Sequence, residues 1–201
     1  MEQQIRITAA PSPVDGLKCT FEADRPILEG RSFYFHTAER AAGSPLAERI
    51  LAIEEVQALV VSHNRVEIEL NQPMDWRVIG KQVGGIIREE LESEGPAFSA
   101  ELFAQLTPAA EIRHLVEQVL ETQVNPMVAS HGGVIRLLDV RENVVYIEMG
   151  GGCQGCGMAS ATLRQGVEKL IREFVPDVGD ILDSTDHASG QNPYYASTGL
   201  S

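Results

Sequence analysis

Alternating apolar and polar residues predict strands in the first half of the chain. Residues 66–70 alternate between Val, Ile or Leu and Glu, a pattern that favours a strand with one buried and one wet face. The β-branched run 56–62 precedes it, and the polar residues 63–65 between the two runs indicate a hairpin. Residues 31–35 are aromatic and extended in character. We therefore predict a small sheet here.

Helical spacing surrounds these strands. Ser44 followed by Pro45 is typical of a helix start, with Ser as the N-cap and Pro in the first turn. Asp75 offers a second N-cap to a helix whose apolar residues recur every three or four positions as far as Leu91. Gly84-Gly85 inside this helix costs about 1 kcal/mol per Gly relative to Ala, so we expect a close packing contact there. Residues 1–91 are predicted to form an α+β domain.

The periodicity lapses over residues 92–106, which we interpret as a linker. Phe98, Leu102 and Phe103 are too apolar for a fully solvated segment, and they favour a short helix that docks on a neighbouring surface.

Residues 107–182 are predicted to form a second α+β domain, in the order α-β-β-α. A helix starts at Thr107-Pro108 and is expected to end near Val124, where Asn125-Pro126 stops or redirects it. Strands are expected over 134–140 and 144–149, followed by a glycine-rich loop and a helix from Ala159 that Pro176 closes. Residues 183–201 are a polar tail. The predicted fold class is therefore α+β, with two small domains joined by a linker.

Composition narrows the function. The chain has 201 residues, 43% of them hydrophobic and 22% charged, as in folded water-soluble proteins. A formal net charge of -13 without a basic cluster argues against nucleic acid as a partner. No apolar run approaches the roughly 18 residues of a membrane span, and the N-terminus lacks the features of a targeting signal. Three cysteines are a poor disulfide framework and fit a reducing compartment, so a cytoplasmic location is expected.

Candidate chemistry is concentrated in the glycine-rich loop, where Cys153 and Cys156 are separated by two residues. This spacing serves zinc sites, iron-sulfur clusters and dithiol redox sites. Zinc and cubane clusters usually take four protein ligands, and one chain supplies two here. Cys19 has no second ligand nearby and is expected to be a buried, inert thiol. The missing ligands most simply come from a second copy, which predicts a homodimer. A zinc-bridged structural dimer and a dithiol oxidoreductase remain alternatives.

The surrounding residues suit such a site. Gly150, Gly151, Gly152, Gly155 and Gly157 are expected to take positive φ and bring backbone N-H groups close to cluster sulfur. A helix starting just after Cys156 would favour thiolate over thiol through its dipole. His131 is interpreted as a turn histidine, and Met149 is expected to pack beneath the loop.

The second domain resembles the NifU C-terminal domain of the Nfu family of iron-sulfur carriers. The resemblance rests on Val124-Asn125-Pro126, His131-Gly132-Gly133, the segment Gly152-Cys153-Gln154-Gly155-Cys156 and residues 161–168. It implies one [4Fe-4S] cluster per homodimer, with Cys153 and Cys156 as the metal and cofactor ligands. It further implies a carrier or scaffold without catalytic residues, whose partners are apo-proteins that receive the cluster and upstream cluster assembly proteins.

The first domain resembles the N-terminal domain that accompanies this module in many Nfu proteins. The matching segments are residues 11–21, Ser44-Pro45-Leu46-Ala47 and Asp75-Trp76. By analogy, this domain is expected to recognise the recipient proteins.

Overall fold

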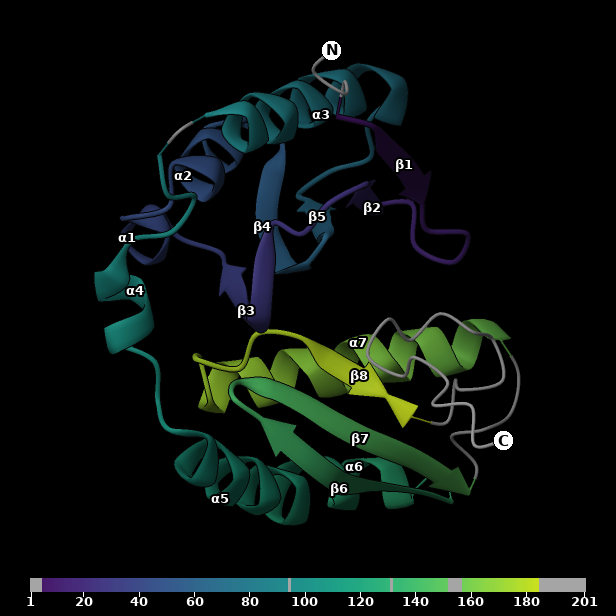
Figure 1. The fold of residues 1–201 in the computed structure, drawn as a ribbon. Helices are drawn as coiled ribbons and strands as arrows, with labels where there is room; N and C mark the ends of the chain where they lie inside the picture. The colour runs from purple at the N-terminus through teal and green to yellow at the C-terminus, as the bar shows by residue number, and fades with distance from the viewer. Residues whose placement is uncertain (1–4, 94, 131, 152–156, 185–201) are drawn as a thin grey trace, which may run out of the picture. The chain divides into compact units, whose positions relative to one another are not determined.

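The computed structural model describes residues 5–93, 95–130, 132–151 and 157–184. The chain forms two compact units, which divide between Pro108 and Ala109 (Figure 1). Each unit packs helices on a β-sheet, so the α+β fold class predicted from the sequence is confirmed.

The first unit is built on a five-stranded antiparallel sheet with the order β1-β2-β5-β4-β3. β4 and β5 form the predicted hairpin, while β1 and β3 are the edge strands. β1 and β2 were not predicted from the sequence, because both strands are short and β1 is largely exposed. The strands are β1 (Ile7–Pro11), β2 (Lys18–Ala23), β3 (Leu28–Phe35), β4 (Val56–His63) and β5 (Arg65–Leu70).

Two helices of this unit begin at the predicted caps. The Ser44 hydroxyl accepts a hydrogen bond from the Ala47 N-H at 3.2 Å, and the Asp75 carboxylate accepts one from the Arg77 N-H at 2.9 Å. Such bonds satisfy N-H groups that have no partner inside the helix. The helices are α1 (Ala38–Ala41), α2 (Pro45–Leu51), α3 (Trp76–Glu92) and α4 (Ala100–Ala104).

The segment expected to be a linker carries α4 and contributes to the core of the first unit. Phe98 is buried and stacks on Phe33, with ring centroids 5.4 Å apart. Phe103 meets Phe33 edge-on at 5.4 Å. These aromatic contacts explain why the compact first unit extends to Pro108.

The second unit contains a three-stranded sheet with the order β6-β7-β8. β6 and β7 are antiparallel, whereas β8 runs parallel to β7. Buried residues from the helices and the sheet form one core, including Ile112, Val116, Ile135, Ile147 and Ile171. The elements are α5 (Ala109–Val119), the π-helical turn η1 (Leu120–Val124), α6 (Asn125–Ala129), β6 (Gly133–Arg141), β7 (Val144–Gly151), α7 (Gly157–Phe174) and β8 (Ile181–Asp183).

Two details of this unit differ from the sequence prediction. The helical path does not end near Val124, because η1 leads directly into α6, where Pro126 stands in the first turn. Proline is tolerated there since the first N-H groups of a helix have no partner inside it. β8 is an additional strand of three residues, too short to show a periodic pattern.

Candidate functional site

Cys153 and Cys156 lie in residues 152–156, outside the described residues. The described backbone defines where this segment is attached. β7 ends at Gly151, and α7 begins at Gly157, one residue after Cys156. The cysteine motif therefore joins a strand to the N-terminus of a helix of 18 residues. A helix N-terminus carries a partial positive charge, which favours the thiolate form that binds metal.

The strand side of this junction is held by β6. The two strands stay paired to the end, with Gly133 opposite Gly151 and Val134 opposite Gly150. A Cβ added at Gly150 would lie 3.2 Å from Cγ1 of Val134, closer than most Cβ contacts in proteins. We expected positive φ at Gly150, and this expectation is wrong, since Gly150 is in regular strand conformation. Its small size is needed for the close approach of Val134 instead.

Positive φ occurs before β6, at Gly132 (φ 70°). Glycine adopts this left-handed conformation without the steric cost that a Cβ imposes. Gly132 also donates a hydrogen bond from its N-H to the Ala129 carbonyl at 2.9 Å, which ends α6 and turns the chain into the strand. Positive φ was not predicted for Gly132, which lies directly before β6.

Asn125 fixes the start of β6. Its side-chain nitrogen donates to the Ile135 carbonyl at 3.0 Å, and its side-chain oxygen accepts from the Ile135 N-H at 2.8 Å. The carboxamide thus bonds both backbone groups of Ile135, as a residue of a neighbouring strand would. Sequence reasoning did not recognise this role, because Asn before Pro indicates a turn without indicating a partner ten residues away.

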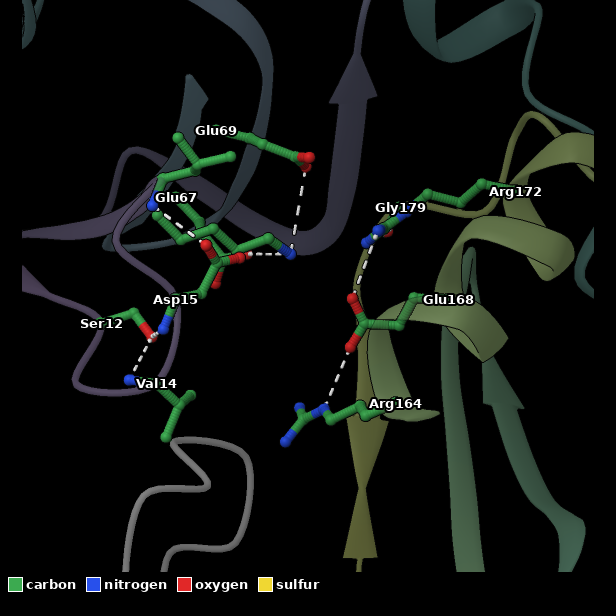
Figure 2. A network of polar contacts seen from close by, with 11 residues as sticks. Ser12, Val14, Asp15, Glu67, Glu69, Arg164, Glu168, Arg172 and Gly179 are labelled. Carbon is green, nitrogen blue, oxygen red and sulfur yellow. Dashed lines mark hydrogen bonds and ion pairs between the residues drawn. The ribbon is translucent and has the colours of Figure 1, made fainter. Parts of the chain in front are cut away.

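The helix side of the junction is anchored by α7. Val167 and Ile171 are fully buried in the core of the unit. Figure 2 shows Glu168 between two arginines of the same helix: Arg164 Nε donates to its carboxylate at 3.0 Å, and Arg172 Nη1 lies 3.6 Å from the other oxygen.

Arg172 extends this anchoring to the segment after α7. It donates through Nη2 to the Gly179 carbonyl at 2.9 Å and through Nε to the same oxygen at 3.3 Å. The carbonyl lies in the connection that leads to β8. The core contacts and this bridge tie α7 to the same sheet that holds the other end of the cysteine segment.

Asn143, in the turn between β6 and β7, bonds the far end of the hairpin to the segment that follows α7. Asn143 is buried; its side-chain nitrogen donates to the Asp177 carbonyl at 3.1 Å, and its backbone carbonyl accepts from the Gly179 N-H at 3.1 Å. The turn between β6 and β7 is thereby bonded to the segment that leads from α7 into β8. Both ends of the cysteine segment therefore belong to one hydrogen-bonded unit.

Cys19 is placed as predicted, in a setting unsuited to metal binding. It lies in β2 with 1% of its surface exposed, and burial raises the pKa of its thiol to about 11. It belongs to the first unit, whereas Cys153 and Cys156 belong to the second. Within the parts of the chain that the structure describes, no group of three or more His, Cys, Asp or Glu could hold a metal ion.

Met149 and His131 are the other two residues that the sequence placed near the cysteine loop. Met149 is 4% exposed and packs in the core of the second unit next to the strand end. His131 lies outside the described residues.

Comparison with protein families identifies both units. A family model described as "NifU-like domain" matches residues 116–182, and one described as "Scaffold protein Nfu/NifU N terminal" matches residues 5–94. The first match includes Cys153 and Cys156, and the two matches follow the order of the two units. The chain belongs to the Nfu family.

Several proteins named "Fe/S biogenesis protein NfuA" are similar to this Nfu chain. The one from Azotobacter vinelandii is 47% identical over 81 residues, which is 40% of this chain and 42% of the relative. The one from Xanthomonas axonopodis pv. citri is 41% identical over 116 residues, 57% of this chain and 53% of the relative. The matches thus span about half the length of these relatives.

One solved structure also matches part of this chain. The match to the solution structure of a NifU-like protein from Saccharomyces cerevisiae covers 50% of this chain and 90% of that protein, with 17% identity and a TM-score of 0.43.

Across the described ranges of this Nfu chain, none of the helices has the length and apolar character needed to cross a bilayer.

Proposed function

We propose that this chain carries a [4Fe-4S] cluster, held between two copies by Cys153 and Cys156 of each, and transfers it to apo-proteins. The supporting observation is the location of the two-thiol motif inside the NifU-like match, between the end of β7 and the N-terminus of α7. The strand end and the helix are both anchored to one core, so the chain on either side of the thiols is held firmly.

The number of available ligands leads to the dimer. A cubane cluster takes four cysteine thiolates, and this motif supplies two. Cys19 is a poor third ligand, because its thiol is buried and its raised pKa disfavours the thiolate. Two copies related by a two-fold axis supply four thiolates without any further residue.

Transfer is proposed as an exchange of ligands. Four iron-sulfur bonds to the carrier cysteines break, and four bonds to cysteines of the recipient form. The recipient thiols lose four protons as they bind, and the released carrier thiolates can take up four. The irons and sulfides pass as one unit without a change of oxidation state, so no oxidant or reductant is required. In this proposal the chain is a carrier rather than an enzyme.

The first unit is proposed to recognise recipients and upstream assembly proteins in the cytoplasm. Its only cysteine is buried, and no group of metal ligands occurs among its described residues. A role in binding other proteins is therefore better supported than a role in holding the cluster.

Anaerobic reconstitution with iron and sulfide tests the cluster. We expect about four irons and four sulfides per dimer, with the dimer detected by sedimentation. Cys153→Ser and Cys156→Ser should each abolish the bound cluster, whereas Cys19→Ser, the matched control, should retain it. Stoichiometric zinc in a colourless dimer, or a protein that only cycles a disulfide, would favour the zinc or the oxidoreductase alternative.

Transfer and recognition are tested with a purified apo-protein that needs a [4Fe-4S] cluster for activity. The loaded chain should restore that activity in the presence of an iron chelator. A version that starts at Thr107 should take up the cluster normally but transfer it more slowly to at least one recipient. Equal transfer rates to every recipient tested would contradict the recognition role of the first unit.

A further inference from the structure

A groove opens on the first unit between α3 and the edge of the sheet. Its volume is about 220 Å³. Phe21, Ile7 and Ala9 line it from the strands, and Gly80, Gly84 and Gly85 line it from the helix. Lys81 and Arg88, also on α3, add two cations. The groove is therefore apolar along its strand side and positively charged along the helix.

The glycines of α3 keep this groove open. We expected Gly84-Gly85 to make a close packing contact. This expectation is wrong, because a Cβ added at either residue would meet no atom of the described residues within 4 Å. One turn earlier, a Cβ at Gly80 would reach ordinary contact with the Phe21 ring at 3.7 Å. Each glycine costs the helix about 1 kcal/mol relative to alanine. Packing does not require Gly84 or Gly85, although each lowers helix stability. The absence of their side chains leaves the groove open.

The strand beside the groove has one edge without a neighbouring strand among the described residues. β1 is the first strand of the sheet, and within the described part of the chain it pairs only with β2. The Asp24 N-H donates to the Arg6 carbonyl at 3.0 Å, and the Ser12 N-H donates to the Lys18 carbonyl at 2.9 Å. Because antiparallel bonding alternates along a strand, the backbone groups of Ile7 and Ala9 point away from β2. The two residues that line the groove are thus the two that offer backbone groups to an added strand.

The cations lack acidic partners within the described ranges. Lys81 is exposed, and Arg88 donates only to the Ile5 carbonyl, at 3.3 Å. The neighbouring carboxylates Glu89 and Glu90 both pair with Arg49 on α2. In a chain of net charge -13, this is a local positive site. It favours an acidic ligand.

We propose that β1 and this groove bind an extended, acidic segment of a recipient polypeptide. The segment would add a strand to β1, place one Leu, Ile or Phe side chain against Phe21, and direct an Asp or Glu carboxylate to Lys81 and Arg88. The volume is below the roughly 300 Å³ at which sites for drug-sized molecules begin, and it suits a single side chain. Backbone bonds supply affinity in such strand addition, and the pocket supplies specificity. The identity of the partner as a recipient rests on the proposed function.

A random heptapeptide library selected on the full-length apo-chain tests the groove. We expect enrichment of peptides in which an apolar residue and an Asp or Glu stand two positions apart, because side chains two apart in a strand lie on the same face. The best peptide should bind at least tenfold more weakly to Gly84→Leu, whose side chain fills the groove, and several-fold more weakly to Lys81→Glu. Gln82→Leu on the exposed face of α3 and Lys169→Glu in the second unit are matched controls that should bind normally. On binding, the amides of Ile7 and Ala9 should become protected from hydrogen exchange.

Opposite results would overturn the inference. These are selection of basic peptides, no enrichment over a blank surface, or equal binding to the wild type and Gly84→Leu. Lys81→Glu keeps the test valid if Gly84→Leu does not fold, because Lys81 is exposed. Self-association that Gly84→Leu abolishes would assign the groove to a second copy. Peptide binding needs no cluster and should survive in Cys153→Ser, so failure of the groove and failure of the carrier function are distinguishable.

Discussion

The side-chain carboxamide of Asn125 hydrogen-bonds both backbone groups of Ile135, as donor at 3.0 Å and as acceptor at 2.8 Å. Ile135 is buried, so its peptide groups have no access to water at this point. One side chain at the start of α6 thus fixes the strand that pairs with the end of β7, next to the cysteine segment. Asn125 acts on the proposed site through the backbone and not by touching the cluster.

Asn125→Ala should destabilise the second unit by about 1–3 kcal/mol, because it leaves a buried donor and a buried acceptor without partners. Calorimetric unfolding of the full chain would measure this loss, and the Ile135 amide should exchange faster with solvent. Asn71→Ala is the control, since the Asn71 side chain is exposed and donates to the Glu54 carbonyl. Equal effects of the two substitutions would contradict the assignment.

Gly150→Ala should destabilise the chain by about 1 kcal/mol or more through overpacking against Val134. The loss should shrink in the background of Val134→Ala, which removes the crowded methyl group, and a double-mutant cycle of thermal unfolding measures the coupling. In Gly166→Ala, in α7, the added Cβ would have no atom of the described residues within 4 Å, so this substitution should be neutral or stabilising. Additive effects at Gly150 and Val134 would rule out the contact.

Arg172→Ala should cost more stability than Arg164→Ala, although both arginines pair with Glu168. The Arg172 side chain is 12% exposed and also bonds the Gly179 carbonyl, so its loss leaves buried polar groups unsatisfied, at about 1–3 kcal/mol. The Arg164 side chain is 39% exposed, and such surface pairs contribute about 1 kcal/mol or less. Urea unfolding of the two variants provides the comparison, and the reverse order would refute it.

Cys19 should make stability depend on alkaline pH. Burial raises the pKa of its thiol from 9.0 to about 11, so the unfolded chain ionises first as the pH increases. Stability is therefore unaffected by this group below about pH 9 and falls between pH 9 and 11, by at most about 1.4 kcal/mol per pH unit.

Two variants that differ only at position 19 isolate this effect. Cys153→Ser/Cys156→Ser retains Cys19, and the triple variant adds Cys19→Ala. The difference in their free energies of unfolding should change only above pH 9. A constant difference up to pH 11 would show that the thiol ionises freely in the folded state.

Several features followed from the sequence because they depend on neighbours in the chain. Ser44 and Asp75 cap the helices that they were expected to cap, since capping joins residues two or three positions apart. The β4-β5 hairpin is visible for the same reason, as its strands alternate and its turn is short. The two-thiol motif is likewise local, and its residues establish how many ligands one chain can contribute.

Tertiary structure decided what depends on distant residues. β8 becomes a strand only because β7 offers it an edge, Asn125 acquires its role from a carbonyl ten residues away, and Phe98 and Phe103 join the first unit because Phe33 lies there. From the sequence, two adjacent glycines in a helix are compatible with either a close packing contact or an open surface. The positions of β1 and β2 decide that Gly84 and Gly85 line a groove. Sequence determined the two thiols and the local elements around them, because those rest on bonding between near neighbours, whereas packing determined which surfaces remain available to a partner.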